Sequence, residues 1–260
     1  EGGSGAGHGS PGRVGFDDVG VLVEPPSVTD RFVSVGNAAA FVDASMFVHE
    51  IGHSIHWPHS YLDPDDEYTN PVDVMSRDPD LADEGEPPEY CDGNDGWPVH
   101  CWAQHTIAFN RLAAGWLDDR QVAIHRSGAT NYTLAAPTAA AARGVQLVAA
   151  PDPAHPARIL TIEARPAIGR DRFNERAGVA VHLIDQTEPE IVFGYPFEDM
   201  VSLDRRQAQA VGEPNSYDHV VAPGESLTVG GVTVTVDADG AGESCRVTVR
   251  GTYRGVSLED

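Results

Sequence analysis

Four histidines and one glutamate lie within eleven consecutive residues, the stretch "HEIGHSIHWPH" at positions 49–59. This stretch ends a longer segment, beginning at residue 37, whose composition and periodicity predict a helix. Residues four apart lie one turn above each other on a helix, so His49 and His53 can aim two imidazole nitrogens at one ion. Glu50 can reach a water on that ion without binding the metal itself. The H-E-x-x-H spacing therefore predicts a zinc site of the metalloprotease kind.

A tetrahedral catalytic zinc needs a third protein ligand and one position left for water. His56 lies on the same helix face, but it is displaced by about 4–5 Å of helix rise past the nearer ligand. His59 follows Pro58, which cannot continue the helix, so the chain can turn there and bring His59 back towards the ion. We predict His59 as the third ligand. His56 and Trp57 are then candidates for contacts behind the ligands.

These residues resemble the metzincin zinc signature, which reads His-Glu-x-x-His-x-x-Gly-x-x-His. A second element, "NPVDVMS" at 70–76, resembles the Met-turn, a tight turn whose methionine underlies the zinc ligands; here it is Met75. The wording Asp-Val-Met-Ser, and "FNRLAAGWL" after it, are similar to the gametolysin and immune inhibitor A branches of secreted metzincins. The resemblance implies a zinc endopeptidase in which Glu50 is the general base and one catalytic Zn²⁺ activates the attacking water.

Two features depart from the family pattern. The family has glycine where this chain has His56, and histidine adopts a left-handed turn at some cost. The stretch before the active-site helix is also short, which suggests that part of the N-terminal subdomain is missing. Both departures favour an alternative, a catalytically weak or inactive surface or adhesion module that keeps a structural zinc. Water in the fourth zinc position supports the enzyme, and a protein ligand there supports the module.

The pattern of elements predicts an α+β fold with three parts. Residues 1–15 are glycine-rich and expected to be flexible; 16–119 form a metzincin-like domain; 120–260 form an all-β, sandwich-like antiparallel domain. The first domain should hold strands at 19–26 and 31–36, the active-site helix, the Met-turn and a second helix at 101–117 closed near Gly115. The second should hold strands within 146–150, 158–165, 178–185, 225–237 and 245–251, where apolar and polar residues alternate.

The net charge of −23, from 40 acidic and 17 basic residues, argues against nucleic acid as a partner, because phosphate binding needs a basic footprint. A protein or peptide substrate is expected instead. No stretch approaches the roughly 20 apolar residues that span a bilayer. Two acidic loops, 63–73 and 92–96, carry oxygen ligands of the kind Ca²⁺ requires but lack EF-hand spacing. A solvated loop is the favoured interpretation, with calcium binding as the alternative.

Three cysteines are present. Cys91 and Cys101 bracket a short Gly/Pro/Asn/Asp-rich loop, and a disulfide there would stabilise the fold by roughly 2–3 kcal/mol on the chain-entropy model. Cys245 is left over, as a buried thiol or as a partner for another chain. A disulfide implies export, so we expect a secreted protein, although the sequence begins with neither a methionine nor a signal peptide. The pattern is silent on oligomeric state and cleavage preference.

Overall fold

In the computed structural model most of the regular secondary structure in the described residues is β-strand. The described residues are 14–16, 21–23, 48–49, 51–52, 57, 60, 70–76, 91–92, 100–101, 105–137, 144–172, 174, 176–186, 209–210, 219–239 and 242–255. Helix within these ranges is limited to short segments, among them α2 (Ala108–Ala113) and the 3-10 turns η2 (Val74–Ser76) and η4 (Gly169–Asp171). The fold is therefore sheet-rich, with α and β structure side by side.

The larger of two principal sheets has six strands, in the order β10-β9-β8-β7-β5 with β11 also paired to β9. These strands are β5 (Val122–Ile124), β7 (Leu147–Pro151), β8 (Arg158–Arg165), β9 (Gly178–Asp185), β10 (Gln209–Ala210) and β11 (Val220–Val221). Strands β8 and β9 have the predicted ends. The expectation of a wholly antiparallel domain is wrong, because β5 and β7 are parallel. The chain between them passes through the second sheet and re-enters from the same end.

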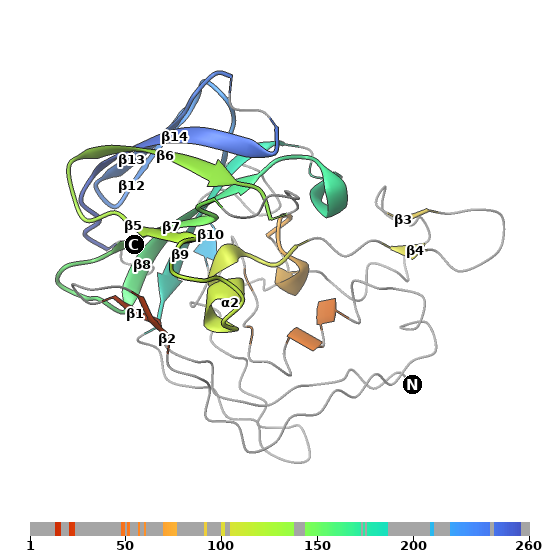
Figure 1. Ribbon diagram of the computed structural model, residues 1–260, viewed down its shortest axis with the longest axis horizontal. Coiled ribbons are helices and arrows are strands. Elements are labelled where there is room, and N and C mark those ends of the chain that lie inside the picture. Colours follow the sequence, from red (N-terminus) through yellow and green to blue (C-terminus); the bar gives the residue numbers. More distant parts are fainter. Residues whose placement is uncertain are drawn as a thin grey trace, which may run out of the picture.

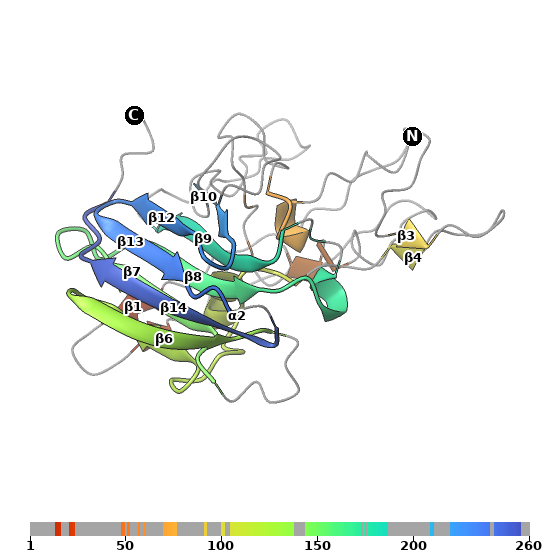
Figure 2. The ribbon, with the colours of Figure 1, turned by 90° about the horizontal axis from the view of Figure 1, so that it is seen from above.

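The second sheet has four strands in the order β12-β13-β14-β6. They are β6 (Ala129–Ala135), β12 (Ser226–Val229), β13 (Val232–Val236) and β14 (Ser244–Gly251). Gly230 and Gly231 join β12 to β13 with φ of 54° and 81°, the conformation that a two-residue hairpin turn requires. The two sheets pack face to face over a core of apolar side chains from both, including Val232 and Val249 from this sheet and Ile162 from β8 (Figures 1 and 2).

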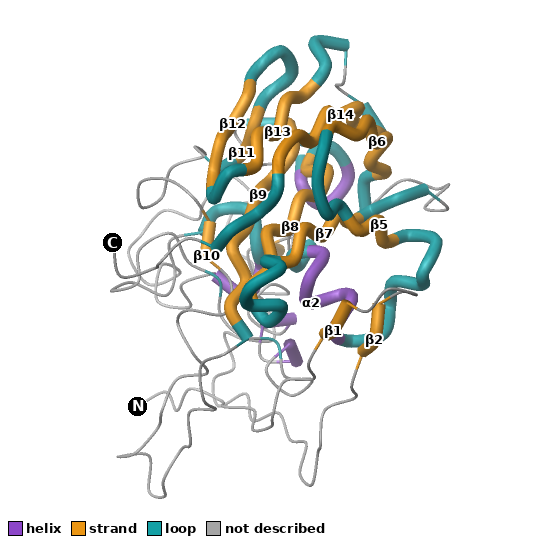
Figure 3. The backbone as a smooth tube through the Cα atoms, turned by 90° about the vertical axis from the view of Figure 1, so that its left-hand side faces the viewer, coloured by secondary structure: helices purple, strands orange, loops and turns teal. Residues whose placement is uncertain are grey.

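The far face of the larger sheet is buried as well, so the sheet is a central layer. Helix α2 lies on that face (Figures 1 and 3). Ile107 and Leu112 pack there in one apolar cluster with Ile159 of β8 and Ile184 of β9. The polar residues that alternate with the core residues of β8 also point this way. These are Thr161, Glu163 and Arg165, which are 4%, 2% and 0% exposed.

A buried ionic cluster joins α2 to this face. Nε of Arg165 lies 3.3 Å from Oε2 of Glu163, and Nη1 of Arg165 lies 3.3 Å from Oδ2 of Asp171. Arg111 of α2 pairs with the same Glu163 oxygen at 3.2 Å. The other oxygen of Glu163 accepts the backbone N–H of Ala108 at 2.9 Å, in the first turn of α2. Two cations thus meet two carboxylates, so little net charge is buried.

Helix α2 is shorter than the helix predicted at 101–117. Cys101 belongs to a strand, residues 105–107 are not helical, and α2 begins at Ala108. The preceding backbone is held by the sheet side instead: the N–H of His105 donates to Asp171, and its carbonyl accepts from Arg165. At the other end α2 stops at Ala113, before the predicted residue 117. Gly115 closes the helix as predicted: it adopts φ 73°, and the N–H of the next residue donates to Arg111 O, as in a Schellman motif.

Two small hairpins complete the described structure. β1 (Val14–Phe16) pairs with β2 (Val21–Val23). Val14 and Gly15 therefore belong to a strand, although they fall in the segment 1–15 that was predicted to be flexible. β3 (Cys91–Asp92) pairs with β4 (His100–Cys101) and lies apart from both sheets in Figures 1 and 2. The predicted strand at 31–36 lies outside the described residues.

Removing Arg165 should destabilise the protein strongly. Arg165→Met leaves Glu163 and Asp171 buried with less compensating charge, which typically costs on the order of 3–5 kcal/mol of unfolding free energy. Urea unfolding measures the difference. The control is Arg246→Met, since Arg246 also pairs with two carboxylates, Asp237 and Asp239, but on the surface. Equal losses for the two variants would contradict the structural role of the buried cluster.

Candidate metal site

The segment Asn70–Ser76 forms a tight, buried turn at the place predicted for the Met-turn. Met75 is fully buried within η2. Asp73 closes the turn with two hydrogen bonds. Its side-chain Oδ1 accepts the backbone N–H of Met75 at 3.1 Å, and its backbone carbonyl accepts the N–H of Ser76 at 3.0 Å. An aspartate that bonds the backbone two residues ahead is a common device for closing a turn. The local sequence Asp-Val-Met-Ser thus accounts for two of the hydrogen bonds that close the turn.

His49, the first predicted zinc ligand, is tied to this turn. It lies in a helical segment with Val48 and is 4% exposed. Its Nδ1 lies 3.0 Å from the carbonyl oxygen of Val74, the residue before Met75. A carbonyl can only accept, so Nδ1 carries a proton, and in the neutral ring Nε2 then carries the lone pair. This is the tautomer that a histidine needs when it binds a metal through Nε2, with its ring oriented by the second nitrogen.

Gly52 lets the turn pack directly against the helix. A Cβ placed on Gly52 would overlap Sδ of Met75 and would lie 2.8 Å from Cε3 of Trp57. Trp57 is 3% exposed, packs with Val74 and Met75, and donates its indole N–H to Asn110 O of α2 at 2.9 Å. The sequence gives no local sign of the role of Gly52, because that role depends on close packing against Met75, more than twenty positions away.

The other residues predicted for the zinc site are not among the described residues. Glu50, His53, His56 and His59 all lie outside them, and of the ligand set only His49 is described. Within the described ranges no group of three or more His, Cys, Asp or Glu side chains gathers as a metal site. Zinc binding by His49, His53 and His59 therefore stays a prediction, as does calcium binding by the acidic loops.

A buried polar chain links the turn to the central sheet, and it involves residues that the sequence did not mark as functional. The amide of Asn70 donates to Nε2 of His182 on β9 at 3.1 Å and to Oγ of Ser60 at 3.0 Å. Ser60 donates to Oδ2 of Asp73 at 2.7 Å. Alternation marked His182 as a strand histidine with a satisfied environment. It is buried and its Nε2 is hydrogen-bonded, but its Nδ1 has no partner among the described residues, so this expectation is met only in part. Its partner, 112 residues earlier in the chain, left no local signal.

Burial governs the charge states of these groups. Burial, reinforced by the nearby Arg165, lowers the pKa of His182 to about 3, so the ring is neutral. Burial likewise lowers the pKa of His105 to about 4, against the opposing effect of Asp171. Burial raises the pKa of Asp73, while the hydrogen bonds from Ser60 and from the backbone of Met75 act in the opposite direction.

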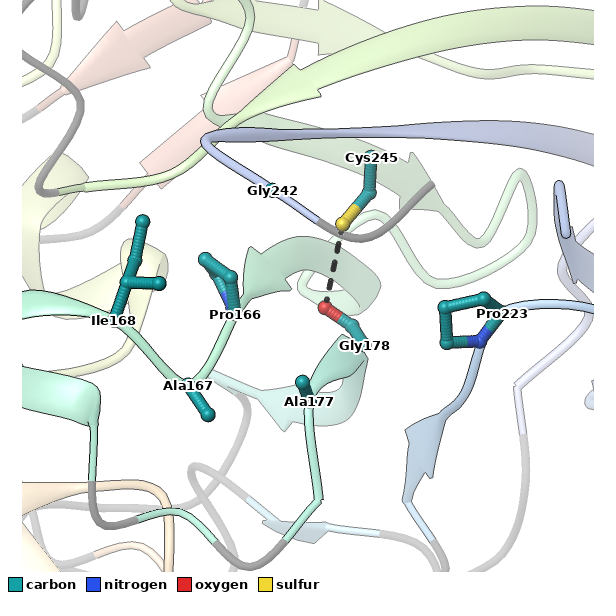
Figure 4. Close-up of a pocket in the computed structure, with 8 residues that line it drawn as sticks. All are labelled: Pro166, Ala167, Ile168, Ala177, Gly178, Pro223, Gly242 and Cys245. Atoms are coloured by element: carbon teal, nitrogen blue, oxygen red, sulfur yellow. Dashed lines mark hydrogen bonds between the residues drawn. The ribbon is translucent and has the colours of Figure 1, made fainter. Parts of the chain in front are cut away.

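The cysteines lie in two distinct settings. Cys91 and Cys101 are directly opposite each other in the β3–β4 register. Facing residues of antiparallel strands have Cα atoms about 4.5–5.5 Å apart, within the range that a disulfide can bridge. Cys245 is 1% exposed and points to Gly178 O, with sulfur and oxygen 3.7 Å apart, beside a small hollow of about 200 Å³ (Figure 4). Burial raises the pKa of this thiol to about 11, as expected for an unreactive core cysteine.

No family model, curated protein or solved structure matches this chain. The resemblance to metzincins therefore depends on motifs of the sequence itself: the zinc signature, the Met-turn sequence and "FNRLAAGWL". In the part of the chain that the structure describes, no helix is long and apolar enough to cross a membrane.

Gly52→Ala should disturb the site. The added methyl group must displace the buried side chains of Met75 or Trp57, and such overpacking typically costs about 1–3 kcal/mol of unfolding free energy. The loss should be smaller when the same change is made in a Met75→Ala background, where the methyl group has room. A double-mutant cycle on urea-unfolding free energies measures this coupling, and strict additivity would contradict the contact.

Stability should fall as the pH is lowered from about 6.5 towards 4. His182 and His105 have pKa values of about 3 and about 4 in the folded protein against 6.5 when unfolded, so unfolding takes up protons in this window. Each neutral histidine adds up to about 1.4 kcal/mol per pH unit to the slope of unfolding free energy. In His182→Gln the slope should be shallower by one proton's share. An unchanged slope would show that His182 is protonated in the folded state.

Proposed function

We propose that this protein is a zinc-dependent endopeptidase of the metzincin type, with His49, His53 and His59 as metal ligands and Glu50 as general base. The observation that carries the proposal is the bond between His49 Nδ1 and the carbonyl of Val74. Zinc-binding histidines usually donate their second ring nitrogen to a carbonyl or carboxylate in this way. The accepting carbonyl, that of Val74, lies on the turn that also places Met75 against Gly52 of the helical segment.

The donor set fits zinc. Three neutral imidazoles are ligands that zinc accepts in catalytic sites, where a fourth position remains for water. His49 has the tautomer that such a ligand needs, and its ring is held by backbone rather than by a mobile side chain. When bound, the zinc would lower the pKa of a water molecule and polarise the peptide carbonyl.

The chain's own residues supply the proton transfers and the scaffold. The Glu50 carboxylate would accept the proton of the attacking water and deliver it to the departing amide nitrogen. Met75 contributes no ligand; its side chain fills the space under Gly52 and keeps the turn against the helix. Asp73 holds the turn closed through Met75 N–H. Rigid support of this kind preserves the alignment on which the proton transfer depends.

The proposal includes export and a protein substrate. Cys91 and Cys101, opposite each other in β3–β4, would form a disulfide in an oxidising compartment. The strongly acidic composition, with net charge −23, gives no footprint for nucleic acid. Peptide bonds of extracellular proteins are then the substrate class that fits a zinc hydrolase of this pattern.

The direct test is casein or gelatin hydrolysis by the wild-type protein and by Glu50→Gln. We expect the variant to keep about one bound zinc per chain and to lose activity by roughly 10²–10⁴-fold, because the general base is gone. A chelator should abolish wild-type activity and added zinc should restore it. Glu225→Gln, which removes one surface carboxylate paired with Arg176, is the matched control and should retain activity.

Two results would go against the proposal. Hydrolysis that survives both chelation and Glu50→Gln would exclude a zinc peptidase. Stoichiometric zinc binding without hydrolysis by the wild-type protein would favour the non-catalytic surface module instead.

A further inference from the structure

The Asn70 side chain stands at the junction between the central sheet and the candidate metal site. Asn70 is 1% exposed, and its partners Ser60 and His182 are fully buried. Its Oδ1 accepts the N–H of Val72 at 3.2 Å, which fixes the orientation of the amide. The NH₂ group must then face His182 and Ser60, and it donates one hydrogen to each. Both donors and an acceptor of this amide are therefore engaged.

The direction of each hydrogen bond follows from this assignment. Ser60 accepts from Asn70 and so donates its own hydrogen to Asp73, which in turn accepts the N–H of Met75. At the other end, Nε2 of His182 must accept, so the ring is neutral with its proton on Nδ1. The chain His182–Asn70–Ser60–Asp73–Met75 thus has one consistent arrangement of protons. Nδ1 of His182 has no hydrogen-bond partner among the described residues, so the chain ends at this ring. Because hydrogen bonds are directional, the chain fixes the relative positions of its members more closely than apolar contacts alone would.

This chain reaches both ends of the predicted ligand set. Ser60 directly follows His59 in the sequence. Met75, at the far end of the chain, lies in the same 3-10 turn as Val74, whose carbonyl orients His49. Val72, between them, packs with Ala180 of β9 and with Val220 of β11. The sheet therefore touches the site through one directional contact, at His182, and one apolar contact beside it.

We infer that His182 and Asn70 are positioning residues of the proposed zinc site, through which the central β-sheet fixes the turn and the Ser60 backbone that flank the ligands. The inference is conditional on the proposed function, because it assigns to the sheet a part in setting zinc affinity. Residues behind the ligands typically change metal affinity by about 10–100-fold when they are removed. His182 would have such an effect from a strand more than a hundred residues away in sequence from His59.

The test compares three single variants of the full chain on strand β9. His182→Leu removes the acceptor at similar volume, His182→Gln restores an acceptor oxygen, and Val181→Ala truncates the adjacent residue, whose side chain faces the sandwich core. Zinc affinity is measured by competition with a chromophoric chelator. Cobalt(II) bound in place of zinc reports the coordination geometry through its visible absorption. Urea unfolding gives the stability of each variant.

We expect His182→Leu to weaken zinc binding by about 10–100-fold and to shift the cobalt spectrum. His182→Gln should bind zinc nearly as the wild type does. Val181→Ala should lower the urea midpoint but leave zinc affinity and the cobalt spectrum unchanged, because its defect lies on the opposite face of the same strand.

Two outcomes overturn the inference while leaving the zinc site intact: wild-type affinity in His182→Leu, or an equal loss of affinity in Val181→Ala, which would reflect general destabilisation. If His182→Leu does not fold, Ser60→Ala removes one hydroxyl from the same chain, and unchanged zinc affinity in that variant also overturns it. A wild-type protein that binds no zinc refutes the proposed function itself, and the inference with it.

Discussion

The polar outer face of the larger sheet is the constraint on which the rest of the structure depends. Glu163, Arg165 and His182 point away from the sandwich core, and none is more than 2% exposed. Polar groups are buried at acceptable cost only when partners satisfy them. The partners of Glu163 and His182 come from outside the sandwich, from α2 and from the 70–76 turn, while Arg165 pairs with Glu163 on its own strand and with Asp171 of η4. The sheet and the elements of the candidate site therefore each complete the other.

The ionic cluster selects one docking position for α2. The apolar contacts of Ile107 and Leu112 with the sheet are not directional, and a small slide of the helix would cost them little. The same slide would separate Arg111 from Glu163 and would leave Ala108 N–H without its carboxylate. An uncompensated buried charge costs several kcal/mol. Because Trp57 donates to Asn110 O and packs against Met75, the position of α2 is passed on to the elements of the candidate site.

The long strands β8, β9 and β14 could be predicted from the sequence, whereas β6 and the contacts between layers were not predicted. β8 and β9 have the predicted ends, because each alternates over eight residues between clear turn signals. The same alternation places Glu163 and Arg165 on the face away from the sandwich core. It cannot reveal that both side chains are buried there, next to Arg111 of α2 and Asp171 of η4. The predicted start of α2 was wrong for a related reason: Asp171 and Arg165 form hydrogen bonds with the backbone of His105. At the candidate site the motif located His49 and Met75, but the links of Asn70 to His182 and of Gly52 to Met75 join residues distant in sequence.

Burying the turn against the sheet has a thermodynamic consequence for any metal bound beside it. Fixing a residue's backbone costs about 1–2 kcal/mol of conformational entropy, and in an isolated loop that cost would be met by metal binding. In this fold the seven residues of the 70–76 turn are held by hydrogen bonds within the turn, such as that from Met75 N–H to Asp73. Their ordering is offset by the contacts of Val72 and Asn70 with the sheet. More of the binding free energy of a metal would then remain as affinity, because the carbonyl that orients His49 is already in place.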